Sequence, residues 1–377
     1  MTEAPSFFLY IAAFLLLLGP LVFVHEYGHY IAGRWFGVKA ETFSIGFGHE
    51  IAGFTDKRGT RWKFGWLPLG GYVKFAGDMN PASQPTAEWL QLPAAERAVT
   101  FQAQPLWQRA IIVAAGPLTN FLLAIVILAG FAVAYGQPST PAVVRDVVPA
   151  SAAAQAGLKS GDRIVAMDGR SVETFNQVAN YTVLRPNERV AIDFERAGRQ
   201  MSAAAVLGVR EERDRFGNVY RLGTLGVASA RPVYTPVRLL EAPLVGLRET
   251  GRIVQATMDG LGQIITGRRS IKEMGGPLKI AQVSGQSLAL GGEAFVFLLA
   301  LISINLGFIN LLPVPVLDGG HLMFYAVEAV RRRPASPWAM EWAFRGGLAA
   351  ILALMLLVTF NDLGAFGLWR GLAGLIG

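Results

Sequence analysis

The sequence contains no cysteine, and charged side chains make up only 16% of its 377 residues, against about 25% in soluble domains. The absence of thiols excludes disulfide bonds and thiolate metal sites, so a metal centre must use imidazole, carboxylate, amide or water ligands. The only histidines are His25, His29, His49 and His321. With 52% hydrophobic residues, the composition predicts an integral membrane protein with a soluble part.

Long apolar stretches are present instead, and they predict a multi-pass α-helical membrane protein. We expect four spans, over segments 1–33, 110–136, 294–320 and 338–377. No small-residue cleavage site follows the first, so it is interpreted as a retained helix rather than a signal peptide. Amphipathic helices are expected over 230–293, either on the membrane surface or packed against the spans. The net charge of +7 fits a role in topology, so no nucleic acid partner is expected.

The first span ends in the motif His25-Glu26-Tyr27-Gly28-His29, directly after the uncharged stretch 7–24. Two histidines four residues apart lie on one helix face and can bind one metal ion. The neighbouring Glu26 can act as general base toward water at the metal. Ionisable side chains at membrane depth are costly and usually functional. The motif therefore predicts a metal centre with His25 and His29 as ligands and Glu26 as the catalytic residue.

A carboxylate that could complete this centre stands at the end of the third span, where Asp318 follows Pro313 and Pro315. The prolines end the helix or unwind its last turn, and metal ligation explains a carboxylate at that depth. Two imidazoles and one carboxylate suit a single zinc ion with one position left for water. Competing ligands are His321, His49 and Glu50. Asn310, or less readily Asn305, can hydrogen-bond substrate backbone or a developing oxyanion.

Basic residues near the span ends indicate how the chain crosses the bilayer. Eight would lie on one side: Arg34, Lys39, Arg97, Arg109, Arg331, Arg332, Arg333 and Arg345. Three would lie on the other: Arg145, Lys279 and Arg370. The positive-inside rule places the first set in the cytoplasm, and the two chain ends and segment 140–229 outside. The histidine motif and Asp318 then share one depth near the cytoplasmic face, which supports a common site.

The cytoplasmic-side loop over 34–109 is rich in glycine and aromatic residues between Phe43 and Phe75. This pattern predicts short β-strands in a membrane-associated β-hairpin, with a small β-subdomain that only packs as the alternative. A transmembrane helix must unwind before one of its carbonyl groups can meet a metal, and a free strand edge can hold the unwound segment. We therefore expect substrate contacts at Gly46, Phe47 and Gly48.

Segment 140–229 is expected to form one inserted α+β domain. Its strand at Val143–Val148, short helix at Ser151–Ala156 and turn–strand–turn at Gly157–Gly169 resemble a PDZ domain of the bacterial protease type. The resemblance implies a peptide-carboxylate loop at Gly223, Leu225 and Gly226, which comes last instead of first and so indicates a circular permutation. Such a domain can bind peptide or act as a size filter above a membrane site.

Together, H-E-Y-G-H, the PDZ-like domain and N-x-x-P-x-P-x-x-D-G-G resemble the site-2 protease family, of the regulator-of-sigma-E protease type. The resemblance implies an intramembrane zinc metalloprotease of the bacterial inner membrane. Its substrates would be single-pass membrane proteins, such as anti-sigma factors trimmed by a first protease, or remnant signal peptides. The family's Gly-Pro-x-x-Asn run is matched by Gly116, Pro117 and Asn120, where Asn120 is expected to join helices rather than to catalyse. Relatives with two PDZ domains differ from this chain, which has room for one.

Two other classes of protein would carry different sequence features. A metal transporter would carry polar residues along several spans, whereas the second and fourth spans hold almost none. A catalytically inactive membrane PDZ scaffold would have lost Glu26 or a metal ligand, and all of them are present. The sequence therefore favours the protease.

Overall fold

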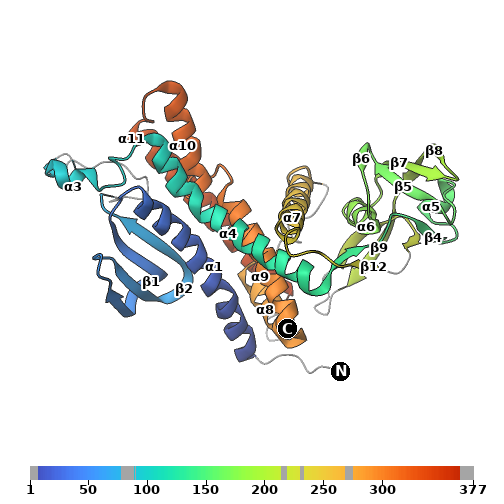
Figure 1. Cartoon of the computed structure of the whole chain (residues 1–377), viewed down its shortest axis with the longest axis horizontal. Coiled ribbons are helices and arrows are strands. Elements are labelled where there is room, and N and C mark those ends of the chain that lie inside the picture. Colours follow the sequence, from blue (N-terminus) through green and yellow to red (C-terminus); the bar gives the residue numbers. More distant parts are fainter. Residues whose placement is uncertain are drawn as a thin grey trace, which may run out of the picture. The chain divides into compact units, whose positions relative to one another are not determined.

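The computed structural model describes residues 7–77, 89, 91–213, 219–229, 233–267 and 275–365. Within these residues, four helices are long and apolar enough to cross a membrane. They are α1 (Phe7–Trp35), α4 (Leu106–Tyr135), α9 (Gly292–Asn310) and α11 (Pro337–Ala365), shown in Figure 1. The predicted four apolar helices are confirmed by length and composition. Residues 366–377 of the predicted last segment lie outside the described residues.

Contacts divide the chain into two compact units, Met1–Ala129 with Pro243–Leu261 and Met274–Asp362, and Gly130–Ala242 with Gly262–Glu273 and Leu363–Gly377. In the first unit, α8 (Pro277–Leu290) packs against α1 and α9 around the buried Leu17, Leu21 and Phe295. Ile253 and Val254 of α7 (Ala242–Ile265) pack on Ala124 and Ile304. The described parts of both helices therefore contact the spans.

Small residues bring α1 and α4 into close contact beside the histidine motif. A side chain at Gly28 would overlap the Ala115 carbonyl and the Thr119 side chain, and one at Gly116 would overlap the His29 ring. Thr119 Oγ1 also donates a hydrogen bond to the Val24 carbonyl at 3.0 Å. Glycine is needed at both positions because the backbones approach closely, as is common between transmembrane helices.

The third span ends earlier than the predicted segment 294–320, because α9 stops at Asn310. Residues 311–317 form a turn in which Pro313 and Pro315 can donate no backbone hydrogen bond. Val316 has a φ of 125°, an unfavourable conformation for a β-branched residue that costs roughly 1–3 kcal/mol. A further helix that the sequence analysis did not expect, α10 (Asp318–Arg331), begins at Asp318.

Two long strands, β1 (Ala40–Thr55) and β2 (Arg61–Phe75), lie where the sequence predicts short strands. Each strand bends, so that its two halves pair separately. In β1, segment 42–45 pairs with 71–74 of β2 on one side and with 61–64 of β2 on the other. Segment 61–65 of β2 also pairs with 50–55 of β1. The bend in β1 falls at Gly46 and Gly48, whose φ angles of 87° and 83° favour glycine. The segments are thus ordered 50–55, 61–65, 40–45 and 71–75, which leaves 71–75 as one edge.

The second unit contains a four-stranded sheet in the order β6-β5-β7-β8. Its strands are β5 (Arg163–Met167), β6 (Arg170–Ser171), β7 (Arg189–Arg196) and β8 (Arg199–Val206), with helices α5 (Ala152–Gln155) and α6 (Phe175–Val183). The late strand β11 (Val227–Ser229) pairs with the early strand β4 (Val144–Val147), which joins the end of the domain to its beginning. The core includes Ile164, Met167, Ile192 and Phe194.

The remaining elements are short. They are α3 (Ala94–Ala98), the pair β3 (Gln137–Ser139) and β12 (Val233–Thr235), and the hairpin β9 (Gly208–Arg213) and β10 (Val219–Thr224).

A buried ion pair stabilises the PDZ-like domain. Asp162 is fully buried, and its two carboxylate oxygens each accept a hydrogen bond of 2.7 Å from the Arg196 guanidinium. The Lys159 N–H donates a third, also of 2.7 Å. Burial raises the pKa of the Asp162 carboxyl, but these hydrogen bonds outweigh it and hold the pKa below its ordinary value.

Because the folded pKa is lowered, this stabilisation is complete above the unfolded value of about 3.9 and is lost as the pH falls through the folded value. We predict that Asp162→Asn speeds amide hydrogen exchange across 140–213 in the intact protein at pH 7 and pH 5. The difference from the wild type should shrink only below about pH 3.9. Asp146→Asn, which breaks an exposed pair with Arg145, is the control and should leave exchange unchanged. Equal exchange in Asp162→Asn and wild type would contradict the prediction.

Candidate metal centre

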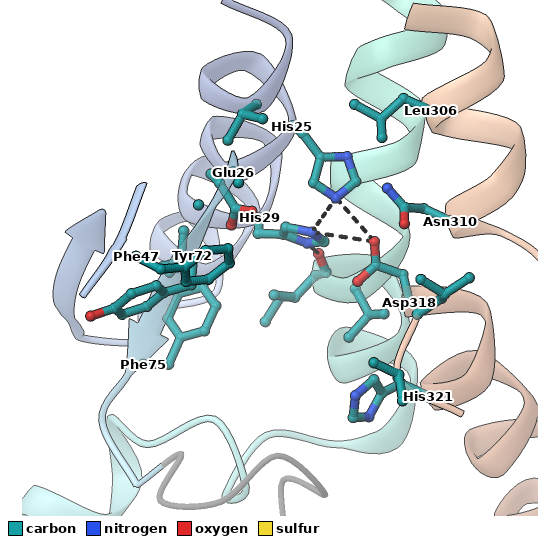
Figure 2. Close-up of a pocket in the computed structure, with 18 of the residues that line it drawn as sticks. His25, Glu26, His29, Phe47, Tyr72, Phe75, Leu306, Asn310, Asp318 and His321 are labelled. Carbon is teal, nitrogen blue, oxygen red and sulfur yellow. Dashed lines mark hydrogen bonds and ion pairs between the residues drawn. The ribbon is translucent and has the colours of Figure 1, made fainter. Parts of the chain in front are cut away.

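The histidines of α1 and the first residue of α10 meet at one point. His25 and His29 lie one helical turn apart, and their Nε2 atoms are 3.3 Å apart. Asp318 Oδ2 is 3.2 Å from His25 Nε2 and 3.5 Å from His29 Nε2. Figure 2 shows the three side chains pointing toward one another. Among the described residues, they form the one group of His, Cys, Asp or Glu side chains arranged to hold a metal ion.

The chemistry of these donors fits a cation. His29 Nδ1 lies 2.9 Å from the Ile112 carbonyl, which can only accept, so a neutral His29 keeps its proton on Nδ1 and directs the lone pair of Nε2 into the group. Ligands about 2.05 Å from a tetrahedral zinc ion lie roughly 3.3 Å from one another, close to the three separations found here. His25, His29 and Asp318 would therefore hold the ion, with imidazole and carboxylate ligands that suit zinc.

Asp318 reaches the histidines because two glycines let its helix approach the end of α9. A side chain at Gly319 would overlap the Leu311 and Leu312 carbonyl oxygens, and one at Gly320 would overlap the Val314 carbonyl. The turn and the start of α10 therefore pack together more closely than any larger residue permits. This contact places the Asp318 carboxylate at the depth of the histidine motif.

Glu26 stands beside the metal group and outside it. Its carboxylate lies near the backbone of Val73 on the edge segment 71–75. A side chain at Gly71 would lie 2.9 Å from Glu26 Cγ, so the strand edge passes directly along this residue. A carboxylate beside the ligands but not among them can receive a proton from attacking water.

The group opens on a cavity of about 650 Å³. Its lining includes Phe47, Gly71, Tyr72, Asn310, His321 and Ile351. Phe47 stacks on Tyr72 with ring centroids 6.2 Å apart, and Figure 2 shows both on the hairpin side of the site. The cavity can accept an apolar peptide segment next to the metal group.

The other predicted site residues occupy several different places. Asn310 lines the cavity. The Asn305 amide oxygen instead accepts a hydrogen bond of 3.1 Å from Thr257 Oγ1, which links α9 to α7. Of the expected substrate contacts in β1, Phe47 lines the cavity, while Gly46 and Gly48 form the bend. The edge nearest the metal group is therefore 71–75.

The competing metal ligands are not part of the metal group. His321 lines the cavity one turn after Asp318, and its ring lies 5.8 Å from that of Phe344. Glu50 pairs with Arg61 in the hairpin, and the neighbouring His49 is exposed. Asp318 is thus the carboxylate that joins the two histidines.

The predicted carboxylate loop of the PDZ-like domain is closely packed. Leu225 is buried in the domain core, and Gly226 has a φ of 78°. A side chain at Gly223 would overlap the Thr182 carbonyl at the end of α6. These contacts explain the glycines of the loop by packing and backbone conformation.

The role of α4 in supporting the two histidines is not among the features predicted from the sequence. Ile112, Gly116 and Asn120 are spaced four apart and so share one face of this helix. Ile112 supplies the carbonyl for His29, Gly116 makes room for the His29 ring, and the Asn120 side chain lies 3.1 Å from His25 Nδ1. Asn120 does join helices, as predicted, but its partner is a ligand histidine. Its spacing from Gly116 was the signal available in the sequence.

An ion pair links α4 to the helix that carries Asp318. Arg109 Nη2 lies 2.9 Å from Glu328 Oε1, and both side chains are largely buried, at 18% and 23% exposure. The guanidinium also lies over the Tyr325 ring, 5.2 Å from its centroid. Arg109 and Glu328 therefore hold α10 against the helix that orients the histidines.

We predict that Glu328→Gln weakens zinc retention at least about tenfold, because a hydrogen bond to a charged group contributes about 1.5–3 kcal/mol. Competition with a chelator measures the effect. Glu341→Gln is the control, because it breaks the exposed pair between Arg345 and Glu341 on α11 and should leave retention unchanged. Equal losses in the two variants would contradict a role for Glu328 in placing α10.

Comparisons with known proteins agree with this site. A family model described as "Peptidase family M50" matches residues 13–354. Over 362 residues the chain is 47% identical to "Putative zinc metalloprotease Atu1380" of Agrobacterium fabrum, covering 94% of this chain and 95% of that protein. It is 37% identical over 394 residues to Metalloprotease MmpA of Caulobacter vibrioides, covering 98% and 99%.

Among solved structures, the PDZ domain of the SdrC-like protein of Listeria monocytogenes is similar to part of the chain. It is 19% identical, covers 25% of this chain and 88% of its own, and has a TM-score of 0.19.

The family match includes the histidine motif, the α4 face and Asp318. Both relatives align over nearly their full lengths, so the similarity concerns the whole architecture and not one motif. The family resemblance noted in the sequence is confirmed. The chain belongs to peptidase family M50, the site-2 protease family of zinc metalloproteases.

Proposed function

We propose that the protein is an intramembrane zinc metalloendopeptidase, with one zinc ion, that cuts within the transmembrane segments of single-pass membrane proteins. One observation carries the proposal: Glu26 and the two histidines of the metal group lie in the C-terminal half of the apolar helix α1 and open on a cavity bordered by a strand edge. The substrates are of the anti-sigma factor or remnant signal peptide type, trimmed first by another protease, in regulated intramembrane proteolysis.

The residues around the metal group divide the chemistry between them. A bound zinc ion supplies Lewis-acid activation of water and of the scissile carbonyl. Glu26, near the backbone of Val73, takes the proton of the attacking water and delivers it to the leaving amine. Asn310, on the cavity wall, donates a hydrogen bond to the substrate backbone or the developing oxyanion.

A transmembrane substrate must be extended before its backbone can react, because a helix satisfies its backbone groups internally. The edge segment 71–75 can receive it. Among the described strands this segment pairs only with 40–45, and it passes along Glu26, because a side chain at Gly71 would lie 2.9 Å from Glu26 Cγ. Pairing along this edge places an extended substrate beside Glu26.

Exposed apolar side chains on the hairpin support its association with the bilayer. Ile51, Phe54, Phe64 and Trp66 are between 53% and 71% exposed. Exposed apolar side chains that lie together mark an interaction site, and aromatic residues favour the membrane–water interface. We assign this surface to the lipid headgroup region around the active site.

The distribution of basic residues supports an orientation in the bacterial inner membrane. Both termini and the PDZ domain are assigned to the periplasmic side, and the metal centre lies near the cytoplasmic face. The PDZ domain then meets the trimmed outer end of the substrate, either as a peptide-binding module or as a size filter.

The catalytic assignment predicts different losses in two variants. Glu26→Gln should retain zinc and lose cleavage of a single-span reporter by at least about a hundredfold, because it removes a general base. Asp318→Asn should lose both zinc and cleavage. The measurements are metal content of the purified protein and reporter cleavage in cells.

Cleavage that persists unchanged in Glu26→Gln would contradict the protease proposal. Zinc binding without cleavage in the wild type would favour an inactive PDZ scaffold. Zinc uptake by vesicles that carry the wild type would favour a transporter.

The hairpin assignment predicts that Phe47→Ala lowers reporter cleavage about tenfold while zinc stays bound, because a half-buried aromatic side chain contributes about 1–2 kcal/mol. Phe54→Ala is a matched control. Phe54 is also an exposed phenylalanine of β1 and stacks on Trp62 at 6.2 Å, but it lies on the far edge of the hairpin. An equal effect of both changes would indicate a general role in lipid contact and would count against substrate contact at Phe47.

A further inference from the structure

The Asn120 side chain is enclosed where three spans meet. It is fully buried, its Nδ2 lies 3.1 Å from His25 Nδ1, and its backbone carbonyl accepts a hydrogen bond of 2.7 Å from Ser303 Oγ. Its amide oxygen has no hydrogen-bond partner among the described residues. The hydrogen bond to His25 is therefore the one interaction that this amide makes there, and its direction decides what the amide does.

The two ligand histidines differ in what faces their Nδ1 atoms. Nδ1 of His29 faces the Ile112 carbonyl, which only accepts, so the neutral imidazole presents the lone pair of Nε2 to the metal group. Nδ1 of His25 faces a primary amide, which can donate through nitrogen or accept through oxygen. The nitrogen and oxygen ends have nearly the same shape, so the amide can turn over in the same space.

The direction of the hydrogen bond is coupled to the metal. If the amide nitrogen donates, His25 keeps its proton on Nε2, where Asp318 Oδ2 is the partner at 3.2 Å. If the amide oxygen accepts, the proton moves to Nδ1 and Nε2 is free to bind the ion. With the amide nitrogen toward His25, both ring nitrogens have hydrogen-bond partners when no metal is bound. With the amide oxygen toward His25, Nε2 can bind the metal.

We infer that Asn120 is a positioning residue that selects the imidazole tautomer of His25, by turning its amide oxygen toward Nδ1 when zinc binds. The tautomer of His29 is fixed by the Ile112 carbonyl, whereas the tautomer of His25 changes with the orientation of the Asn120 amide. The Ser303 hydroxyl holds the Asn120 backbone while the amide turns. The inference rests on the zinc centre of the proposed function and adds a residue that acts through His25.

Two substitutions of similar size separate tautomer selection from packing. Asn120→Leu removes the acceptor and should weaken zinc binding about 10- to 100-fold, the usual effect of losing a partner of a metal-bound histidine. Asn120→Asp supplies an acceptor only, in the carboxylate–histidine–zinc arrangement, and should bind zinc as tightly as the wild type or more tightly. A purely structural role predicts loss in both variants.

The measurements are zinc affinity of the full-length protein in detergent, by chelator competition, and the visible absorption spectrum after cobalt substitution. Asn120→Asp should keep the tetrahedral cobalt spectrum, and Asn120→Leu should lose intensity. Thr257→Val is the control, because it removes another interhelical hydrogen bond of 3.1 Å, from Thr257 to Asn305, away from the metal group. It should leave affinity unchanged.

Two failures are distinguishable. If the wild type binds zinc, Asp318→Asn does not, and both Asn120 variants match the wild type or are weakened equally, this inference is overturned and the zinc centre stands. If the wild type and Asp318→Asn bind zinc equally poorly, the zinc centre itself is overturned.

Discussion

The structure depends on the burial of two imidazoles and a carboxylate among apolar helices. Polar groups at that depth are costly unless they are paired, and His25 Nε2, His29 Nε2 and Asp318 Oδ2 converge within 3.5 Å of one another. A divalent cation would accept the lone pairs of the two histidine nitrogens and neutralise the charge of the Asp318 carboxylate. The neighbouring features, from the close crossing of α1 and α4 to the turn before α10, serve to place these three atoms.

The helix without a ligand of its own, α4, organises the centre. Its face at Ile112, Gly116 and Asn120 orients both imidazoles, and Arg109 one turn earlier pairs with α10. Glycines permit this arrangement because both the α1–α4 contact and the start of α10 are closer than a side chain allows. The geometry of the site is therefore a product of helix packing as much as of the ligand motif.

The hairpin adds an element that a helical bundle lacks. Segment 71–75 is an edge that passes along Glu26, so the proposed general base and the strand edge lie next to each other. The bends at Gly46 and Gly48 allow β1 to pair on both sides and leave that edge open. The proposed hydrolysis within the membrane requires both an activated water and an extended backbone, and under that proposal both requirements meet at Glu26.

The sequence by itself determined the apolar helices, the inserted α+β domain, the histidine motif and the candidate ligand Asp318. These follow from local composition and spacing, because span length, helical periodicity and ligand type are properties of short segments. Only the tertiary structure decided which strand edge borders Glu26, that Asn305 faces α7, that α10 begins at Asp318, and that Asn120 and Ile112 support the histidines. These depend on contacts between segments far apart in the chain, and spacing in one segment cannot specify which residue of another will face it.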